Sequence, residues 1–125
     1  MLKNAINKLR KEDNKKMKMK NKVSIYVPST INVSEKIDSA AQVNNTCVFL
    51  SGLFGGCTSV NTSGCWIDSK NKLVKEEITI VYSFCDNIQF LRNRKKVIAY
   101  CKKLCDEMSQ ECISLEINNK LYFIN

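Results

Sequence analysis

The side chains that most often perform catalysis are sparse in this sequence. The chain has 125 residues, among them seven cysteines and no histidine. Histidine is the commonest general base and the usual partner of a nucleophilic Ser or Cys, so its absence removes the arrangements most often used for acyl transfer. We therefore predict no catalytic residues and a protein that is not an enzyme.

The cysteines give two further signals. Cys85 immediately precedes Asp86, which is expected to cap a helix, and a helix N-terminus can activate a thiolate. Cys101, Cys105 and Cys112 are close enough in sequence to share an ion, but no Cys-x2-Cys pair accompanies them. Core packing explains these thiols more simply. We predict no metal site and no cofactor, and a Cys-dependent enzyme stays only as a minor alternative.

The segment from Phe54 to Trp66 is the most distinctive part of the chain. It holds three of the four glycines, several hydroxyls and the only tryptophan. Glycines allow close backbone approach, hydroxyls donate to phosphate or ribose, and an indole stacks on a base. The alternative interpretation is a helix end followed by an edge strand, with Trp66 packed on the core. The residues predicted to bind a nucleotide-like or phosphorylated small ligand are Gly55, Gly56, Thr58, Ser59, Trp66, Arg92 and Arg94.

Positive charge is concentrated at the start of the chain. The formal net charge is +8, and residues 1–22 carry nine basic and two acidic groups, against eleven and ten in residues 23–125. An alternative function is therefore a nucleic-acid-associated accessory protein that uses this arm and the second helix. A solvated tail, or translation from Met17 or Met19 instead of Met1, also explains the arm. The candidate nucleic-acid contacts are Lys15, Lys16, Lys18, Lys20, Lys95 and Lys96.

Periodicity predicts the elements that must position these residues. In chain order they are a strand at 23–27, a loop at 29–38, a helix at 39–54, a short strand or irregular edge at 57–67 that is broken at Gly64, a strand at 73–84, a helix at 86–109, and strands at 112–117 and 121–124. The buried stripe predicted for the second helix consists of Phe90, Val97, Cys101, Leu104 and Met108. Gly55 and Gly56 end the first helix, and Asn118-Asn119 predicts a tight turn. The order indicates an α+β, ferredoxin-like split β-α-β fold (βαββαβ) with an extra C-terminal strand, in which two helices cover one face of an antiparallel sheet.

No helix covers the second face of such a sheet, which we call the open face. In the strand 73–84 the apolar residues Val74, Ile78, Ile80, Tyr82 and Phe84 alternate with mostly polar ones, so we expect this stripe to pack under the helices. The open face would then carry Tyr26, Leu73, Val81 and Tyr122. A partly apolar open face predicts a homo-oligomer formed through the sheet.

The domain organisation is predicted to be a basic arm at residues 1–21 and a single α+β domain at residues 22–125. The sequence has no signal-peptide pattern and no apolar run of 18 residues. We therefore predict a cytoplasmic protein with no membrane partner.

Several short motifs resemble those of a group of small uncharacterised proteins carried by plasmids and phages of low-GC Gram-positive bacteria. They are Ser24-Ile-Tyr-Val-Pro-Ser-Thr30, Phe49-Leu50, Leu53-Phe-Gly-Gly56 with Thr58, Gly64-x-Trp66 and Leu73-Val-Lys-Glu76. The resemblance spans residues 23–124 and implies a mobile genetic element. The group has no assigned activity, so it supplies no site residues. With the ligand segment above, it predicts a non-enzymatic binding module.

Overall fold

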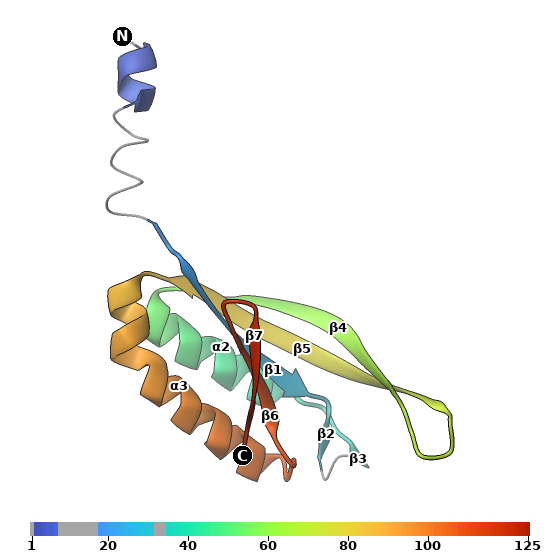
Figure 1. The fold of residues 1–125 in the computed structure, drawn as a ribbon. Coiled ribbons are helices and arrows are strands. Elements are labelled where there is room, and N and C mark those ends of the chain that lie inside the picture. The colour runs from blue at the N-terminus through green and yellow to red at the C-terminus, as the bar shows by residue number, and fades with distance from the viewer. Residues whose placement is uncertain (1, 8–17, 32–34) are drawn as a thin grey trace.

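A five-stranded antiparallel sheet with two long helices on one face forms the body of the protein (Figure 1). The computed structural model describes residues 2–7, 18–31 and 35–125, of which residues 2–7 are helical. The long helices are α2 (Ala40–Phe54) and α3 (Asn87–Glu107). In spatial order the strands are β4 (Thr58–Ile67), β5 (Leu73–Cys85), β1 (Asn21–Pro28), β6 (Ile113–Ile117) and β7 (Lys120–Ile124). A separate two-stranded sheet pairs β2 (Thr30–Ile31) with β3 (Glu35–Lys36).

This topology confirms the predicted α+β, ferredoxin-like arrangement. β1 lies at the centre and pairs antiparallel with β5 on one side and β6 on the other, although β5 and β6 follow it much later in the chain. β4 extends the sheet beyond β5, and β7 adds the extra C-terminal strand beyond β6. Both helical connections lie on the same face of the sheet (Figure 1).

Local sequence signals set the ends of these elements as predicted. The Asp86 carboxylate accepts a 2.7 Å hydrogen bond from the Gln89 backbone N–H, and the Gln89 side chain accepts one from the Asp86 N–H, which together form a capping box at the start of α3. α2 ends at Gly55, whose φ of 92° favours glycine. Asn118 and Asn119 adopt φ values of 52° and 69° in the turn between β6 and β7.

The core lies between the helices and the sheet. Val23, Ile25 and Val27 of β1 are buried there, together with Leu50 and Phe54 of α2. The buried stripe of α3 and the turn after it contains Val97, Cys101, Leu104, Cys105 and Met108. This stripe agrees with the predicted helix periodicity, apart from Phe90, which is only partly buried.

The prediction of which β5 residues face the helices is wrong. Ile25 pairs directly with Val81 and Val23 with Ser83, so Val81 and Ser83 share the helix-covered face of β1, and both are buried. Leu73 and Tyr122, which were predicted on the open face, also lie on the helix-covered face. Of the residues predicted on the open face, only Tyr26 lies there. Small residues face α2 because the helix packs closely there, and the buried Ser83 hydroxyl donates a hydrogen bond to the Gly56 carbonyl oxygen.

The open face is consequently apolar. The stripe of Ile78, Ile80, Tyr82 and Phe84 lies there, and 52% of Phe84 is exposed. On the flanking strands the open face continues with Val60, Leu121 and Phe123, all of them exposed. We call these seven residues the open-face patch.

Two segments are more regular than predicted. β4 runs unbroken through Gly64, where an added Cβ would stand 2.8 Å from Ile78 Cδ1. The glycine therefore admits the Ile78 side chain instead of ending the strand. Residues 29–38, expected to be a loop, contain the β2–β3 hairpin.

Candidate active site

The principal cavity lies where the β4–β5 hairpin extends past the end of β1. Pro28 pairs with Ile78, so the residues of β5 before Ile78 have no partner in β1 and pair with β4 alone. The β2–β3 hairpin stands opposite this extension (Figure 1). The space between the two hairpins is a cavity of about 620 Å³. Its lining residues are Ser29, Thr30, Lys36, Ser63, Trp66, Val74, Lys75, Glu76 and Glu77.

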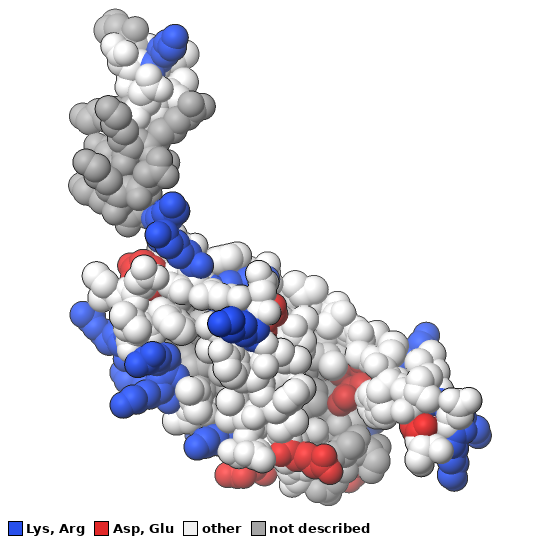
Figure 2. Space-filling view, in the orientation of Figure 1, with Lys and Arg blue, Asp and Glu red and all other residues white. Residues whose placement is uncertain are grey.

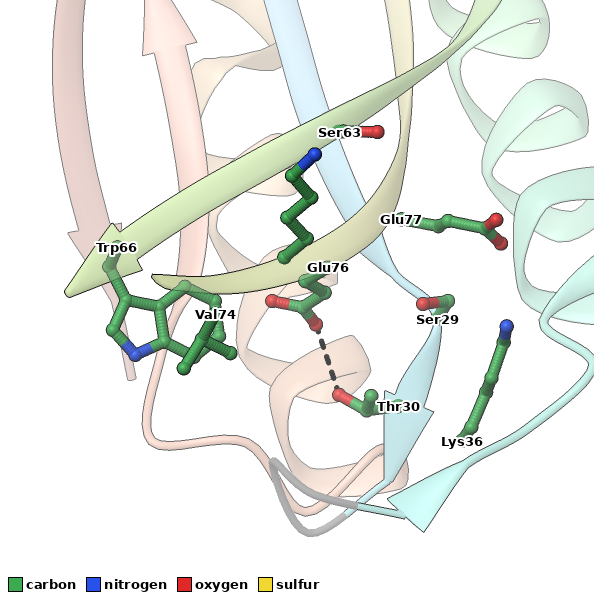
Figure 3. A pocket seen from close by; sticks show the side chains of 9 residues that line it. Ser29, Thr30, Lys36, Ser63, Trp66, Val74, Glu76 and Glu77 are labelled. Atoms are coloured by element: carbon green, nitrogen blue, oxygen red, sulfur yellow. Dashed lines mark hydrogen bonds between the residues drawn. The ribbon is translucent and has the colours of Figure 1, made fainter. Parts of the chain in front are cut away.

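One side of this cavity is apolar. Trp66 and Val74 are directly paired across β4 and β5, and their side chains lie together beside Glu76 (Figure 3). The indole is 44% exposed, so Trp66 is not packed into the core. An accessible aromatic face next to an aliphatic side chain is a surface on which a flat heterocycle can stack.

The other side is charged. Thr30 Oγ1 donates a 3.0 Å hydrogen bond to Glu76 Oε1, which fixes that carboxylate at the middle of the cavity (Figure 3). Glu77 lies beyond it, on the side of Ser29 and Lys36 (Figure 3). The only ion pair among the described residues is Lys103–Glu107 on α3, so neither glutamate is neutralised by Lys36 or Lys75. The cavity is therefore lined by two carboxylates and two ammonium groups that form no ion pairs with one another.

A second cavity of about 390 Å³ shares lining residues with the first. The shared residues are Ser29, Ser63 and Glu77, so the two form one groove. The second part is lined mainly by polar side chains, among them Asp38, Asn61 and Thr79. It extends the groove toward the start of α2.

The structure separates most of the predicted ligand residues from Trp66. Gly55, Gly56, Thr58 and Ser59 lie at the connection between α2 and β4, at the opposite end of β4 from Trp66. At roughly 3.3 Å per residue, the eight steps from Thr58 to Trp66 span about 26 Å. Of the predicted ligand set, only Trp66 lines the cavity.

The predicted basic contacts lie elsewhere. Arg92, Arg94, Lys95 and Lys96 are exposed on α3, where Figure 2 shows basic side chains gathered over the helix. Lys18 and Lys20 are exposed just before β1. Lys15, Lys16, Met17 and Met1 lie outside the described residues. None of the basic side chains that the structure describes in this set lines the cavity.

Cys85 and Cys101 are poorly suited to nucleophilic attack. Burial, and then the neighbouring Asp86 charge, raises the pKa of the Cys85 thiol to about 11, and burial raises the pKa of Cys101 to about 12. A buried thiol with a raised pKa is protonated at neutral pH and unreactive. In the described part of the chain, no three His, Cys, Asp or Glu side chains are grouped so that they could hold a metal ion.

The sequence-based prediction missed the residues that line the charged side of the cavity. Ser29, Thr30 and Lys36 belong to a segment expected to be a loop, and the β2–β3 hairpin brings them opposite β5. A signal was nevertheless present at Glu76 and Glu77, because Glu76 interrupts the apolar alternation of β5. A carboxylate in an apolar strand often marks a functional position.

Comparisons with known proteins identify the fold but no family. No protein-family profile matches the sequence, and no curated protein matches it either. Among solved structures, the chain is similar to a phage SAM lyase in complex with S-methyl-5'-thioadenosine, with a TM-score of 0.62 and 18% identity over 84% of this chain and 88% of that chain. A phage SAM lyase in the apo state matches with a TM-score of 0.61 and 18% identity over the same shares.

These matches correct the predicted function. Both of these solved structures are of a SAM lyase, an enzyme, which contradicts the predictions of a non-enzymatic binding module and of a protein that is not an enzyme. The ligand of the first match carries no phosphate and is not a nucleic acid, so the expectation of a phosphorylated ligand or a nucleic-acid partner finds no support. Of the predicted resemblance, the supported part is a structural likeness to a phage protein. Among the described residues, no helix is long and apolar enough to span a membrane.

Proposed function

We propose that this chain is an enzyme that cleaves S-adenosylmethionine (SAM) in the cavity between the β4–β5 and β2–β3 hairpins. The observation that carries the proposal is that one cavity is lined by an accessible indole and by two carboxylates that form no ion pair with the described residues. The likeness to a SAM lyase supports it, because the same fold holds S-methyl-5'-thioadenosine in that protein.

The apolar side of the cavity fits the adenosine part of SAM. Adenine is a flat heterocycle, and stacking on an aromatic side chain contributes about 1–3 kcal/mol per base. Trp66 supplies the aromatic face, and Val74 extends the apolar surface next to it.

The charged side fits the rest of the molecule. SAM carries a sulfonium, an α-ammonium and an α-carboxylate group, so a site for it needs charges of both signs. Glu76 and Glu77 supply negative charge for the cationic sulfonium and ammonium, and Lys36 and Lys75 supply positive charge for the carboxylate. Charges held within a partly enclosed cavity attract one another more strongly than they would in water.

The proposed reaction breaks one carbon–sulfur bond. When the product is S-methyl-5'-thioadenosine, sulfur keeps its methyl and adenosyl groups, so the bond to the γ-carbon of the methionine part is broken. The bonding electron pair moves to sulfur, which loses its positive charge. As this bond breaks, either an oxygen of the substrate's own carboxylate attacks the γ-carbon and closes a lactone, or a carboxylate of the cavity takes a proton from the β-carbon and a double bond forms between the β- and γ-carbons. Neither route consumes water. Glu76, held by Thr30, is placed to bind the sulfonium next to the breaking bond.

The direct test is to incubate the purified full-length protein with SAM and to follow S-methyl-5'-thioadenosine by liquid chromatography and mass spectrometry. We expect protein-dependent product formation that Glu76→Gln reduces at least tenfold. The matched control is Glu111→Gln, because Glu111 is exposed and does not line the cavity. Product formation at the uncatalysed rate would reject the proposal.

We also propose that residues 22–125 form the single catalytic domain and that residues 1–21 are not needed for cleavage. The support is that, among the described residues, every side chain lining the cavity comes from Ser29 or later in the chain. A protein that lacks residues 1–16 should keep full activity. A loss of activity in a correctly folded deletion variant would contradict this division.

We further propose that a second copy of the chain covers the open face. The open-face patch is apolar, and four of its residues are exposed, which is unfavourable in water: Val60, Phe84, Leu121 and Phe123. Analytical ultracentrifugation should therefore detect a homo-oligomer, and Phe84→Lys should shift it to monomer. Leu91→Lys is the matched control, because Leu91 is an equally exposed apolar residue on α3. A wild-type monomer at high concentration would reject the proposal.

A further inference from the structure

The carboxylate at the centre of the cavity is tied to a residue distant in sequence. Thr30 Oγ1 donates to Glu76 Oε1 at 3.0 Å, and Gln110 Nε2 donates to the Thr30 carbonyl oxygen at 2.8 Å. Gln110 follows α3, Thr30 begins β2, and Glu76 lies on β5. Two consecutive hydrogen bonds therefore join three segments that are otherwise separate.

Gln110 is itself held firmly. Its backbone N–H donates to the Cys105 carbonyl oxygen at 3.0 Å, and Cys105 Sγ donates back to the Gln110 carbonyl oxygen at 3.1 Å. The side-chain amide makes a second bond, of 3.2 Å, to the Met108 carbonyl oxygen. Cys105 and Met108 are buried in the core, so Gln110 is anchored to the core.

Gln110 also lies next to Glu76 in space. A cavity of about 110 Å³ adjoins Glu76 on another side and is lined by Glu76, Gln110, Tyr26 and Cys112, among others. Glu76 therefore separates this small cavity from the principal one, which it also lines. The position of its carboxylate depends on where the β2 segment is held.

We propose that Gln110 is a positioning residue for the Glu76 carboxylate, acting through Thr30. It would touch no substrate. Its amide fixes the Thr30 backbone, and the Thr30 hydroxyl then orients Glu76 toward the ligand. The catalytic consequence of this role rests on the proposed function, whereas the placement of Glu76 does not.

The test observes Glu76 directly. In protein labelled with ¹³C at the glutamate carboxyl carbons, Glu76→Gln identifies the Glu76 signal by its disappearance. We expect Thr30→Val to move that signal, and Gln110→Met to move it in the same direction, because Met keeps the length of the side chain but cannot donate. SAM cleavage by Gln110→Met should fall about five- to tenfold in kcat/KM, the usual effect of losing one hydrogen bond.

Gln89→Met is the matched control. It removes an amide of the same size from the other end of α3, where Gln89 caps the helix. It should lower the melting temperature, and it should change neither the chemical shift of the Glu76 signal nor the rate of SAM cleavage. Gln110→Leu provides a second variant that has no amide hydrogens and adds no charge near Glu76, and it should behave like Gln110→Met. An unmoved Glu76 signal in both Gln110 variants would overturn the proposal. If wild-type protein does not cleave SAM, the proposed function fails, and the Glu76 signal still decides the role of Gln110.

Discussion

Ser83 Oγ, on β5, donates a 2.6 Å hydrogen bond to the carbonyl oxygen of Gly56, just after the end of α2. The serine is 2% exposed, so water does not compete for its hydroxyl. This bond joins the last residues of the first helical connection to the face of the sheet that the helix covers. It also explains why a polar residue lies at the core side of β5.

Removing this hydroxyl should destabilise the fold. Ser83→Ala removes a hydrogen bond that a buried hydroxyl donates, which costs about 0.5–1.5 kcal/mol. Urea unfolding followed by circular dichroism measures the change. Ser59→Ala alters an exposed serine on the neighbouring β4 and should stay within about 0.5 kcal/mol of wild type. Equal effects of both substitutions would contradict the role of the Ser83 bond.

Gly64 and Ile78 should be energetically coupled. A methyl group at Gly64 would stand 2.8 Å from Ile78 Cδ1, the flexible end of that side chain, so Gly64→Ala forces Ile78 to shift. We expect Gly64→Ala to cost about 1 kcal/mol in the wild-type background. The cost should be smaller in an Ile78→Val background, because valine lacks the Cδ1 atom. A double-mutant cycle of unfolding free energies measures the coupling, and strictly additive values would refute it.

Stability should fall at alkaline pH because of the buried thiols. Burial raises the pKa of Cys101 from 9.0 to about 12, so between these values the unfolded chain releases this proton while the folded chain keeps it. The stabilising contribution is complete below pH 9 and is lost as the pH rises toward 12. The free energy of unfolding should therefore decline over this range, and the decline should be shallower in Cys101→Ala. Cys65→Ala changes an exposed thiol and should keep the wild-type slope.

Trp66 provides an optical test of ligand binding because it is the only tryptophan. Stacking of adenine on its half-exposed indole should quench the intrinsic fluorescence when S-methyl-5'-thioadenosine is added. By calorimetry, Trp66→Ala should weaken binding by about tenfold, consistent with 1–3 kcal/mol of stacking, whereas Trp66→Phe should keep most of it. Phe123→Ala, an exposed aromatic residue on β7, should bind like wild type. Unchanged fluorescence at a saturating ligand concentration would place the adenine elsewhere.

The order and ends of the elements were predictable because each depends on local chemistry. Asp86 and Gln89 encode the capping box, Gly55 encodes a helix end, and the Asn118-Asn119 pair encodes a tight turn. Which residues of β5 face the helices was not predictable from the alternation of apolar and polar residues in that strand. The same alternation results whether the apolar residues lie under the helices or on the open face. The pairing of β5 with Val23 and Ile25 of β1 determines which β5 residues face the helices. This pairing joins residues about 60 positions apart in the sequence.

The candidate site was predictable only at Trp66. Its other residues converge because the β4–β5 hairpin extends past β1 and because a short hairpin forms within residues 30–36. Neither feature has a periodic signature in the sequence. Gly55, Gly56, Thr58 and Ser59 lie at or just before the far end of the same strand, since eight residue steps separate Thr58 from Trp66.

The central position of β1 has a consequence for the way this protein is made. β1 is the first strand to leave the ribosome, yet one neighbour ends at Cys85 and the other at Ile117. One edge of β1 therefore stays unpaired until the chain has been synthesised through β6. Pairing over such sequence separations slows folding and leaves nascent chains open to aggregation. Loss of β6 and β7 would leave one edge of the central strand β1 unpaired. The sheet can therefore fold completely only after both of these strands have been synthesised.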